Sequence, residues 1–449
     1  MQPDLIRKMS APVPRYTSYP TAPHFHPGVT ADEYGRWLGA LPEDASISLY
    51  LHIPYCDQLC WFCACHTKQT LKYEPLATYV DALIAEIGLV GARAAGRGRV
   101  TAVHYGGGSP TLLIPEDLKR IDRAMREAFR FDPAVEISVE IDPNDVKAEG
   151  YEALAAIGLT RASLGVQDFD PKVQQAINRI QPFERTREVI EAVRRHGARS
   201  VNIDLLYGLP HQTRDSVEAT LRQVLTLRPD RIALFGYAHV PWMKKHQTMI
   251  DEAVLPEAVE RFAQSNRAAS LLAQAGYQAI GIDHFALPQD SLAVAARSGR
   301  MKRNFQGYTD DAPDALIGLG ASSIGQLPQG YVQNMPATGE YQRIVGSGRL
   351  ATVRGFALES DDRLRARVIE RLMCDFAFEA GALRDEFGAG ADDVIAEAGY
   401  LAENDAEQMF ARDGDHFFIT DKGRPFARSI AASFDSYFGS GTARHSMAV

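Results

Sequence analysis

The stretch Ile47-Ser-Leu-Tyr-Leu-His-Ile53, followed by Pro54-Tyr55 and then Cys56-Asp-Gln-Leu-Cys60-Trp-Phe-Cys63, carries the strongest structural signal in this chain. Its first part is a short run of aliphatic, β-branched and aromatic residues, which predicts a buried strand. The three thiols follow almost at once, so we expect them on a loop at the carboxyl end of that strand. Ligands bind at this end of the strands in parallel α/β folds, which makes the loop a candidate site.

The spacing of the three thiols indicates a metal site. Three thiolates can hold three corners of a cubane [4Fe-4S] cluster and leave the fourth iron open to a substrate. A structural zinc site is one alternative, but it usually needs four ligands with paired C-x2-C spacing, which C-x3-C-x2-C fits poorly. Simple burial of the thiols is another. Four of the five cysteines lie between residues 56 and 65, unlike the spread framework of a disulfide-rich secreted domain.

Strand patterns alternate with helical patterns over the first half of the chain. The six strand candidates are residues 47–53, 101–105, 135–141, 161–167, 200–208 and 231–237. The segments between them have helical periodicity, as in residues 73–96, where Leu76, Leu83 and Val90 share one face. Strands alternating with helices of this length imply parallel pairing through right-handed crossovers. The predicted fold class is therefore α/β, an incomplete (β/α)6 barrel.

The alternation stops after about residue 310, which predicts a second, smaller unit. We expect an N-terminal lid segment over residues 1–45, the barrel over 46–310, a mostly helical domain over 311–440 and a flexible tail over 441–449. Residues 361–376 have a helical pattern, and residues 411–423 have the pattern of a short hairpin. Thr420 is a plausible N-cap for a last helix.

Charge and hydropathy exclude two function classes. The formal net charge of −9 argues against a nucleic-acid partner, because neutralising phosphates requires an excess of Lys and Arg. No continuous apolar stretch approaches the roughly 20 residues that span a bilayer. The N-terminus has no apolar core of the signal-peptide kind. We therefore expect a cytoplasmic protein without a membrane span.

The motif C-x3-C-x2-C with an aromatic residue before the last cysteine resembles the signature of the radical S-adenosylmethionine (SAM) enzymes. The resemblance implies that Cys56, Cys60 and Cys63 bind a [4Fe-4S] cluster. The amino and carboxylate groups of SAM would then chelate the open iron. Reduction of the sulfonium would release methionine and a 5'-deoxyadenosyl radical.

Further motifs cover nearly the whole chain and resemble those of one family, the oxygen-independent coproporphyrinogen III oxidases. They are residues 15–21 (RYTSYPT), 50–56 (YLHIPYC), Cys65 after Cys63-Ala64, and residues 165–169 (GVQDF), 202–205 (NIDL), 283–286 (DHFA) and 303–309 (RNFQGYT). That family converts two propionates of coproporphyrinogen III to vinyls without dioxygen, giving protoporphyrinogen IX in haem biosynthesis. A propionate β-C–H bond is unactivated, so a carbon radical suits this chemistry better than a base or a hydride acceptor.

The resemblance implies two SAM molecules and assigns residues to each. For the cluster-bound molecule the residues are Tyr50, Gly106, Glu140 and Ile324, with Ser109 standing where the family usually has Thr. For the second molecule they are Phe62, Gly107, Gly108, Gln167, Arg179, Asp204 and Ala238. Local capping and ion pairing at strand ends is the structural alternative for Gln167, Arg179 and Asp204.

Cys65 lies two positions after the third ligand, Cys63, and cannot replace it without remodelling of the loop. The resemblance implies a catalytic role for Cys65 without metal binding, and a buried bystander thiol is the alternative. Ala64 and His66 depart from the Gly and Asn of close relatives. These two differences do not affect the cluster assignment, but they change the loop at the side where the substrate would bind.

The substrate and its partners follow from the same resemblance. Coproporphyrinogen III has four propionates, so the pocket should offer cationic or amide donors to at least the carboxylates that do not react. The candidates are Arg15, Lys244, Lys245, Lys302 and Arg303. Residues 15–21 could close over the barrel mouth as a lid. A low-potential donor such as flavodoxin or ferredoxin would reduce the cluster, and we expect a monomer.

The competing interpretation is a haem-binding chaperone that keeps the cluster but lacks oxidase activity. Such relatives would lack Cys65 and would have His-Asn-x-x-Tyr-Trp in place of residues 303–308. Both features favour the oxidase here. A radical methyl- or alkyl-transferring enzyme would share the cysteine loop but not the motifs at residues 15–21 and 303–309.

Overall fold

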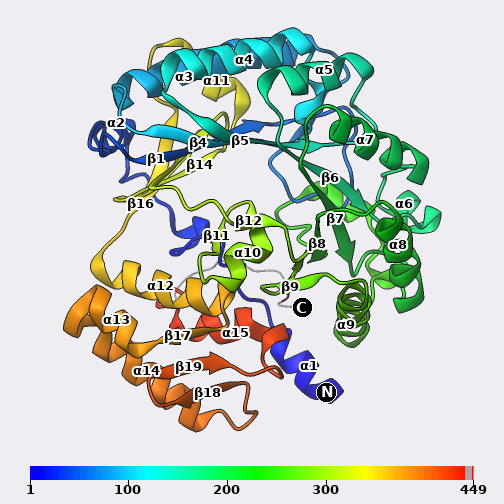
Figure 1. Cartoon of the computed structure of the whole chain (residues 1–449), viewed down its shortest axis with the longest axis vertical. Coiled ribbons are helices and arrows are strands. Elements are labelled where there is room, and N and C mark those ends of the chain that lie inside the picture. The colour runs from blue at the N-terminus through cyan, green and yellow to red at the C-terminus, as the bar shows by residue number, and fades with distance from the viewer. Residues whose placement is uncertain (440–446, 448–449) are drawn as a thin grey trace.

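A curved sheet flanked by helices forms the main body of the protein, and a smaller, mostly helical unit lies against one end of it (Figure 1). The computed structural model describes residues 1–439 and residue 447. Apart from Met447, the predicted tail at 441–449 lies outside the described residues.

All six predicted strands form, and they are neighbours in the sheet in chain order. They are β1 (Ser46–Ile53), β4 (Arg99–Gly107), β5 (Phe131–Ile141), β6 (Arg161–Gln167), β7 (Ser200–Tyr207) and β8 (Arg231–Gly236). Each pairs in parallel with the next. Six adjacent parallel strands confirm the predicted incomplete barrel. Their carboxyl ends therefore meet at one rim.

Helices cover the outer face of these strands. They are α2 (Ala31–Gly39), α3 (Glu74–Ala94), α4 (Pro115–Ala128), α5 (Ala148–Ile157), α6 (Pro171–Ala176), α7 (Phe183–Arg195), α8 (Arg214–Thr226) and α9 (Ala258–Gln274). Apart from the short α6, whose Val173 joins a separate small cluster, these helices place apolar residues in the main core; in α4, Leu118, Ile121 and Met125 are buried. Helix α3 alone is long and apolar enough to resemble a membrane span among the described helices, but half of that stretch is buried in the protein.

The sheet continues past residue 310, so the predicted domain boundary there is wrong. Strand β13 (Ala315–Leu319) pairs in parallel with β1. Three antiparallel strands then extend the sheet: β14 (Ile324–Leu327), β15 (Gly330–Asn334) and β16 (Thr352–Ala357). On the other edge, β10 (His284–Ala286) and β9 (Gln278–Ile280) follow β8. Helix α11 (Thr338–Gly346) packs on α3. These strands are short, and β13, β14 and β15 follow one another without helices between them, so they lack the regular alternation that identified the others.

The C-terminal unit begins with α12 (Ser360–Cys374) and has its own core. It also contains β17 (Ala377–Glu379), α13 (Ala380–Phe387), α14 (Asp392–Asn404), β18 (Phe410–Asp413), β19 (His416–Ile419) and α15 (Ala427–Ala431). The predicted hairpin forms as β18 and β19. Thr420 does not cap a helix: its hydroxyl donates to the Gln408 carbonyl at 2.8 Å, and α15 begins later, at Ala427.

The N-terminal 45 residues are shared between the two units. Helix α1 (Pro3–Met9) places Ile6 in the C-terminal core, next to α15 in Figure 1, whereas α2 belongs to the main core. The segment between them passes the barrel, where Arg15 and Thr17 line its internal cavity. Only this middle part could act as the lid predicted for residues 1–45.

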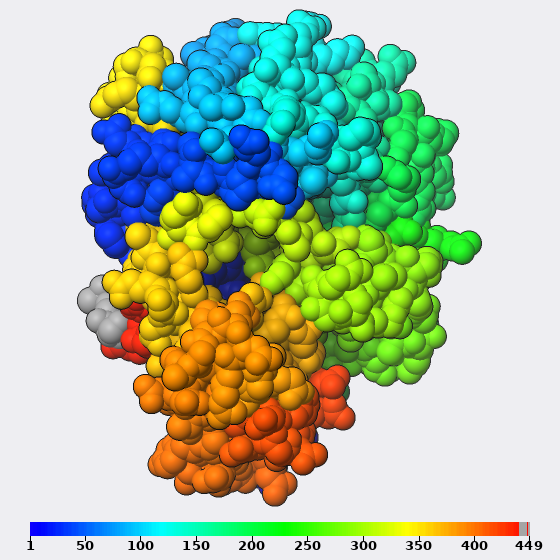
Figure 2. Space-filling view, turned by 60° about the vertical axis from the view of Figure 1, so that its left-hand side comes forward, coloured from blue at the N-terminus to red at the C-terminus, as the bar shows by residue number. Residues whose placement is uncertain are grey.

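A small hairpin and one helix complete the barrel's inner side. The hairpin consists of β11 (Lys302–Asn304) and β12 (Gly307–Thr309), and α10 (Ser291–Arg297) precedes it. A hollow opens between the barrel and the C-terminal helices, with N-terminal residues visible in blue at its floor (Figure 2). This cavity of about 500 Å³ is lined by Tyr16, Tyr19, Lys302 and Arg367, among others.

Candidate active site

The cysteine loop follows β1 as predicted, and each of its three predicted ligand sulfurs has a polar contact. Cys56 lies in β2 (Tyr55–Cys56), which pairs with β3 (Lys68–Gln69), and its Sγ is 3.0 Å from Thr67 Oγ1. Arg179 Nη1 donates to Cys60 Sγ at 3.5 Å. The Cys65 backbone N–H donates to Cys63 Sγ at 3.4 Å. Each of the three predicted ligand sulfurs thus has one polar neighbour.

A segment after β8 holds the loop from outside. Lys244 Nζ donates to the Cys65 carbonyl at 2.8 Å, and His246 Nε2 donates to the Cys63 carbonyl at 2.7 Å. Gln247 Nε2 donates to the carbonyls of Phe62, at 2.8 Å, and Ala238, at 3.2 Å. These contacts fix the backbone of the loop and leave its sulfurs on the cavity side.

The environment of the thiols suits bonding to a positive centre. Burial raises the pKa of Cys56 to about 12 and also raises the pKa of Cys60. A bare thiolate is therefore disfavoured at both positions, whereas a metal ion would stabilise it. At Cys63, hydrogen bonding from Cys65 outweighs burial and lowers the pKa to about 7.

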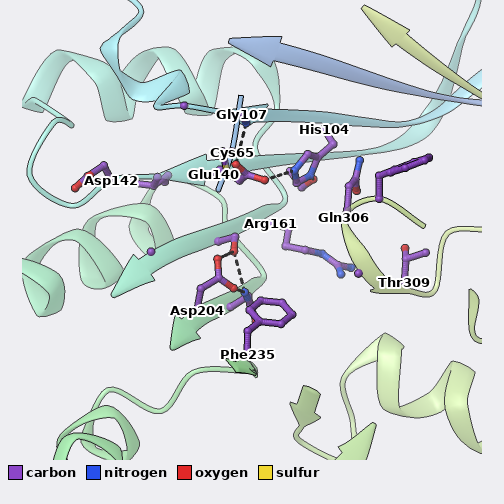
Figure 3. Close-up of a pocket in the computed structure, with 18 of the residues that line it drawn as sticks. Cys65, His104, Gly107, Glu140, Asp142, Arg161, Asp204, Phe235, Gln306 and Thr309 are labelled. Atoms are coloured by element: carbon purple, nitrogen blue, oxygen red, sulfur yellow. Dashed lines mark hydrogen bonds and ion pairs between the residues drawn. The ribbon is translucent and has the colours of Figure 1, made fainter. Parts of the chain in front are cut away.

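A carboxylate lies beside the glycine run at the end of β4. Glu140 Oε2 accepts a hydrogen bond from the Gly107 N–H at 3.0 Å, and Oε1 lies 3.1 Å from His104 Nε2 (Figure 3). A Cβ at position 106 would come within 2.8 Å of Glu140 Oε1, so glycine is needed for this approach. Burial raises the pKa of Glu140, but the hydrogen bond and charge of His104 bring it below its ordinary value. Glu140 is thus held as an anion.

Arg179 and Asp204 form a second polar group beyond Glu140. Arg179 Nη1 contacts Asp142 Oδ2 at 2.7 Å, and Nη2 donates to the Gly165 carbonyl at 2.6 Å. Asp204 accepts hydrogen bonds from Asn202, at 2.7 Å, and Ser163. Burial, followed by the charge of Glu140, raises the pKa of Asp204 to about 6. Gln167 ends β6 with φ of +69°, a strained conformation at the cavity wall.

One cavity of about 610 Å³ unites most of the predicted residues. Its lining includes Cys56, Cys60, Phe62, Cys63, Cys65, Gly107, Gly108, Glu140, Gln167, Arg179 and Asp204. Five predicted residues are not part of that lining: Tyr50, Gly106, Ser109, Ala238 and Ile324. Tyr50 stacks on the cavity residue His104 with ring centroids 5.7 Å apart. Ile324 instead pairs with Gln333 in the sheet.

The structure adds cavity residues to which the sequence assigned no role in the site. They are His104, Asp142, Arg161, Asn202 and Phe235. Alternation along a strand could have found two of them, because His104 precedes Gly106 by two residues and Asn202 precedes Asp204 by two. Figure 3 shows Arg161 reaching into the cavity between Asp204 and Gln306. Nothing in the sequence pattern distinguishes Arg161 from a surface arginine.

The donor arrangement does not resemble a site for a single metal ion. Among the described residues, no three His, Cys, Asp or Glu side chains converge tightly enough to hold one ion. Thiolates at three corners of a cubane lie farther apart than ligands of one ion. The three cysteines, which face one cavity without converging, therefore fit a cluster better than the zinc alternative.

Comparison with known proteins agrees with this geometry. The model of the radical SAM superfamily matches residues 50–224, and the model of the HemN C-terminal domain matches residues 358–426. The oxygen-independent coproporphyrinogen III oxidase of Bradyrhizobium diazoefficiens is 48% identical and covers 97% of each chain. The oxygen-independent coproporphyrinogen III oxidase of Paracoccus denitrificans is 46% identical, and the match covers 95% of this chain and 94% of the Paracoccus chain.

A solved structure is also similar over almost its full length. Coproporphyrinogen III oxidase (HemN) from Escherichia coli, a radical SAM enzyme, is 38% identical and superimposes with a TM-score of 0.90. The match covers 94% of this chain and 98% of that one. Identity of this extent over both units shows a common family. The chain belongs to the oxygen-independent coproporphyrinogen III oxidase family of radical SAM enzymes.

Proposed function

We propose that this chain catalyses the oxidative decarboxylation of two propionates of coproporphyrinogen III to vinyl groups, giving protoporphyrinogen IX in haem biosynthesis. The observation that carries the proposal is that one cavity is lined by Cys56, Cys60, Cys63 and Cys65 together with Glu140. The similarity to coproporphyrinogen III oxidases, which extends over almost the whole chain, supports it.

Membership in the radical SAM superfamily implies a [4Fe-4S] cluster and SAM. When bound, these cofactors supply a carbon radical able to take a hydrogen atom from an unactivated propionate C–H bond. Cys56, Cys60 and Cys63 would hold the cluster. Glu140, kept anionic by His104 and Gly107, would bind a cationic or hydroxyl group of SAM.

A second SAM molecule is a finer proposal with its own support. Gln167 in β6 and Asp204 in β7 lie further along the rim than Glu140, Arg179 lies in the loop after α6, and all three line the cavity. The buried Arg179 Nε has no hydrogen-bond partner among the described residues. That open donor supports a ligand at this position. Titration of the reconstituted enzyme with labelled SAM should give a stoichiometry of two, lowered to one by Asp204→Ala.

Cys65 is proposed as a catalytic residue that is not a cluster ligand. It lines the cavity, and Lys244 holds its carbonyl. The Cys65 thiol hydrogen-bonds to Cys63. This bond raises the pKa of the Cys65 thiol and keeps that thiol protonated. Because Cys65 faces the same cavity, its thiol is available to a substrate bound there.

A low-potential one-electron donor such as flavodoxin or ferredoxin is proposed because the cluster needs reduction. Asp57 and Gln58 of the cysteine loop are exposed, which supports close approach of such a donor. We further propose a monomer. Within the part of the chain described, exposed large apolar side chains such as Leu71, Trp242 and Tyr400 come from segments far apart in the sequence, which supports this. Light scattering of the purified protein tests this.

The deciding experiment is an anaerobic assay of reconstituted enzyme with SAM, a reductant and coproporphyrinogen III, beside Cys65→Ser. We expect protoporphyrinogen IX and 5'-deoxyadenosine together, with porphyrin turnover lost in the variant while its cluster absorbance remains. Deoxyadenosine without porphyrin turnover in the wild type would contradict the substrate. Tight haem binding without either product would instead support the chaperone, which the comparisons do not favour.

A further inference from the structure

Five arginines line the reaction cavity, and three of them are neutralised by carboxylates. Arg161 lies 2.8 Å from Glu136, Arg179 lies 2.7 Å from Asp142, and Arg231 lies 2.5 Å from Asp290. The other two are Arg15 and Arg303. Among the described residues, no carboxylate oxygen lies within 4 Å of either guanidinium. The cavity therefore has two cations without a paired anion.

Arg303 is held rigidly but is incompletely hydrogen-bonded. It lies in β11, and its guanidinium stacks 4.4 Å above the ring of Tyr308 in β12. Nη2 donates to the Arg15 carbonyl at 3.3 Å. Nε and Nη1 are buried and have no partner among the described residues. Buried donors of a charged group are costly when unpaired, so an acceptor is expected beside them.

Arg15 adds a second positive charge at the same place. Its side chain donates a hydrogen bond to the Gly236 carbonyl at 3.1 Å, and its backbone carbonyl accepts the hydrogen bond from Arg303. Burial lowers the pKa of Arg15, and the charge of Arg303 lowers it further, while the charge of Asp283 opposes this. Asp283 is engaged with His284 Nδ1 at 2.6 Å. An added anion would relieve the repulsion between the two arginines.

The two arginines stand where two cavities meet. A further cavity of about 250 Å³, separate from the 500 Å³ hollow described above, shares Arg15, Phe235 and Arg303 with the reaction cavity. A macrocycle in the larger cavity could thus direct a flexible side arm towards this boundary. Gln306 and Thr309, from the same hairpin as Arg303, lie across the cavity from Asp142 in Figure 3.

We propose that Arg303, assisted by Arg15, binds the carboxylate of a propionate that is not decarboxylated. This inference rests on the proposed function. A propionate that reacts loses its carboxylate, which would leave the two arginines unpaired after each turnover. A propionate that persists keeps them paired through both decarboxylations and fixes the orientation of the macrocycle.

The other cations considered from the sequence have different roles. Lys244 donates to the Cys65 carbonyl, and Lys302 pairs with Glu370 at 3.0 Å. Lys245 does not line the reaction cavity. Arg15 and Arg303 are the two of the five candidates that do.

The test measures binding of stable porphyrins to the anaerobically reconstituted enzyme by fluorescence titration. Coproporphyrin III has four propionates, protoporphyrin IX keeps only the two that do not react, and its dimethyl ester has no free carboxylate. Arg303→Met should weaken binding of both free acids by about tenfold or more and leave the ester unchanged. Arg303→Lys should restore part of the affinity, and Arg300→Met, at an exposed position, should have no effect.

Each other outcome has a definite meaning. Weakened binding of coproporphyrin III alone would assign Arg303 to a reacting propionate and overturn the inference. Equal affinities of Arg303→Met and wild type for both acids would overturn it as well, while the proposed function stood. Wild-type enzyme that binds neither acid would instead contradict the proposed function. If Arg303→Met does not fold, Arg15→Met provides the same comparison.

Discussion

His104 Nε2 lies 3.1 Å from Glu140 Oε1, and Glu140 Oε2 accepts a hydrogen bond from the Gly107 N–H. The Glu140 carboxylate on β5 therefore contacts both a side chain and the glycine run of β4. His104 and Glu140 come from adjacent parallel strands, β4 and β5, and both line the cavity. The carboxylate is thus oriented from two sides, and each contact can be removed separately.

His104→Ala should weaken SAM binding by about tenfold without loss of the cluster. The histidine favours the charged form of Glu140, whose pKa burial alone would raise. In the variant the pKa of Glu140 should therefore rise, and SAM affinity should begin to fall at a higher pH than in the wild type. Equilibrium binding between about pH 5 and 8 measures this. His104→Gln, which can still donate, should recover most of the affinity; equal pH profiles for wild type and His104→Ala would contradict the role.

Arg179→Met should destabilise the protein by about 3 kcal/mol, because it leaves the Asp142 carboxylate unpaired beside the cysteine loop. Urea unfolding of the reconstituted enzyme gives the free energy. The double variant Arg179→Met/Asp142→Asn should lose less than the single one, since no charge is then stranded. If the free energy lost by the double variant equals the sum of the losses of Arg179→Met and Asp142→Asn, the ion pair makes no net contribution to stability.

Gly108→Ala should prevent cluster assembly. A Cβ there would come within 2.8 Å of Thr67 Oγ1 and would press on the Tyr55 carbonyl, next to Cys56. Iron and sulfide analysis after reconstitution measures the effect. Gly88→Ala is the control, since position 88 lies within α3 with open space around it, and it should raise stability by about 0.5–1 kcal/mol. A full cluster in Gly108→Ala would contradict the predicted clash.

Glu86 should make stability fall as the pH rises. It is fully buried in α3 and accepts 2.6 Å hydrogen bonds from Gly320 N, Asn334 Nδ2 and Tyr341 Oη. Burial raises its pKa from 4.5 to about 7 despite these bonds. A raised carboxyl pKa means that the folded state binds the proton more tightly. The contribution of Glu86 to the free energy of unfolding is therefore complete below pH 4.5 and is lost as the pH rises past 7. The total loss is on the order of 3 kcal/mol.

Thermal unfolding of wild type and Glu86→Gln from about pH 4.5 to 8.5 tests this. The amide costs one hydrogen bond at every pH, so Glu86→Gln should be offset by a constant but should lack this part of the slope. Parallel curves for the two proteins would exclude Glu86 as the source.

The sequence identified most of the barrel because its signals are local. Each of the six parallel strands is a compact apolar run followed by a helical pattern, and the four clustered cysteines all lie between residues 56 and 65. The domain boundary failed because β13 to β16 are short and because no helix separates β13, β14 and β15. They join the sheet through β1, which lies far earlier in the chain, so no local pattern signals the pairing.

The sequence by itself determined the fold class, the cysteine loop and the family motifs, since these depend on residue types at short spacings. Only the tertiary structure decided which side chains share the cavity. Arg15 and Arg303 are 288 residues apart, yet they form one cationic site because the N-terminal segment lies against the β11–β12 hairpin. Whether an arginine is neutralised depends on which carboxylates the fold brings within a few ångströms, and no local pattern encodes that.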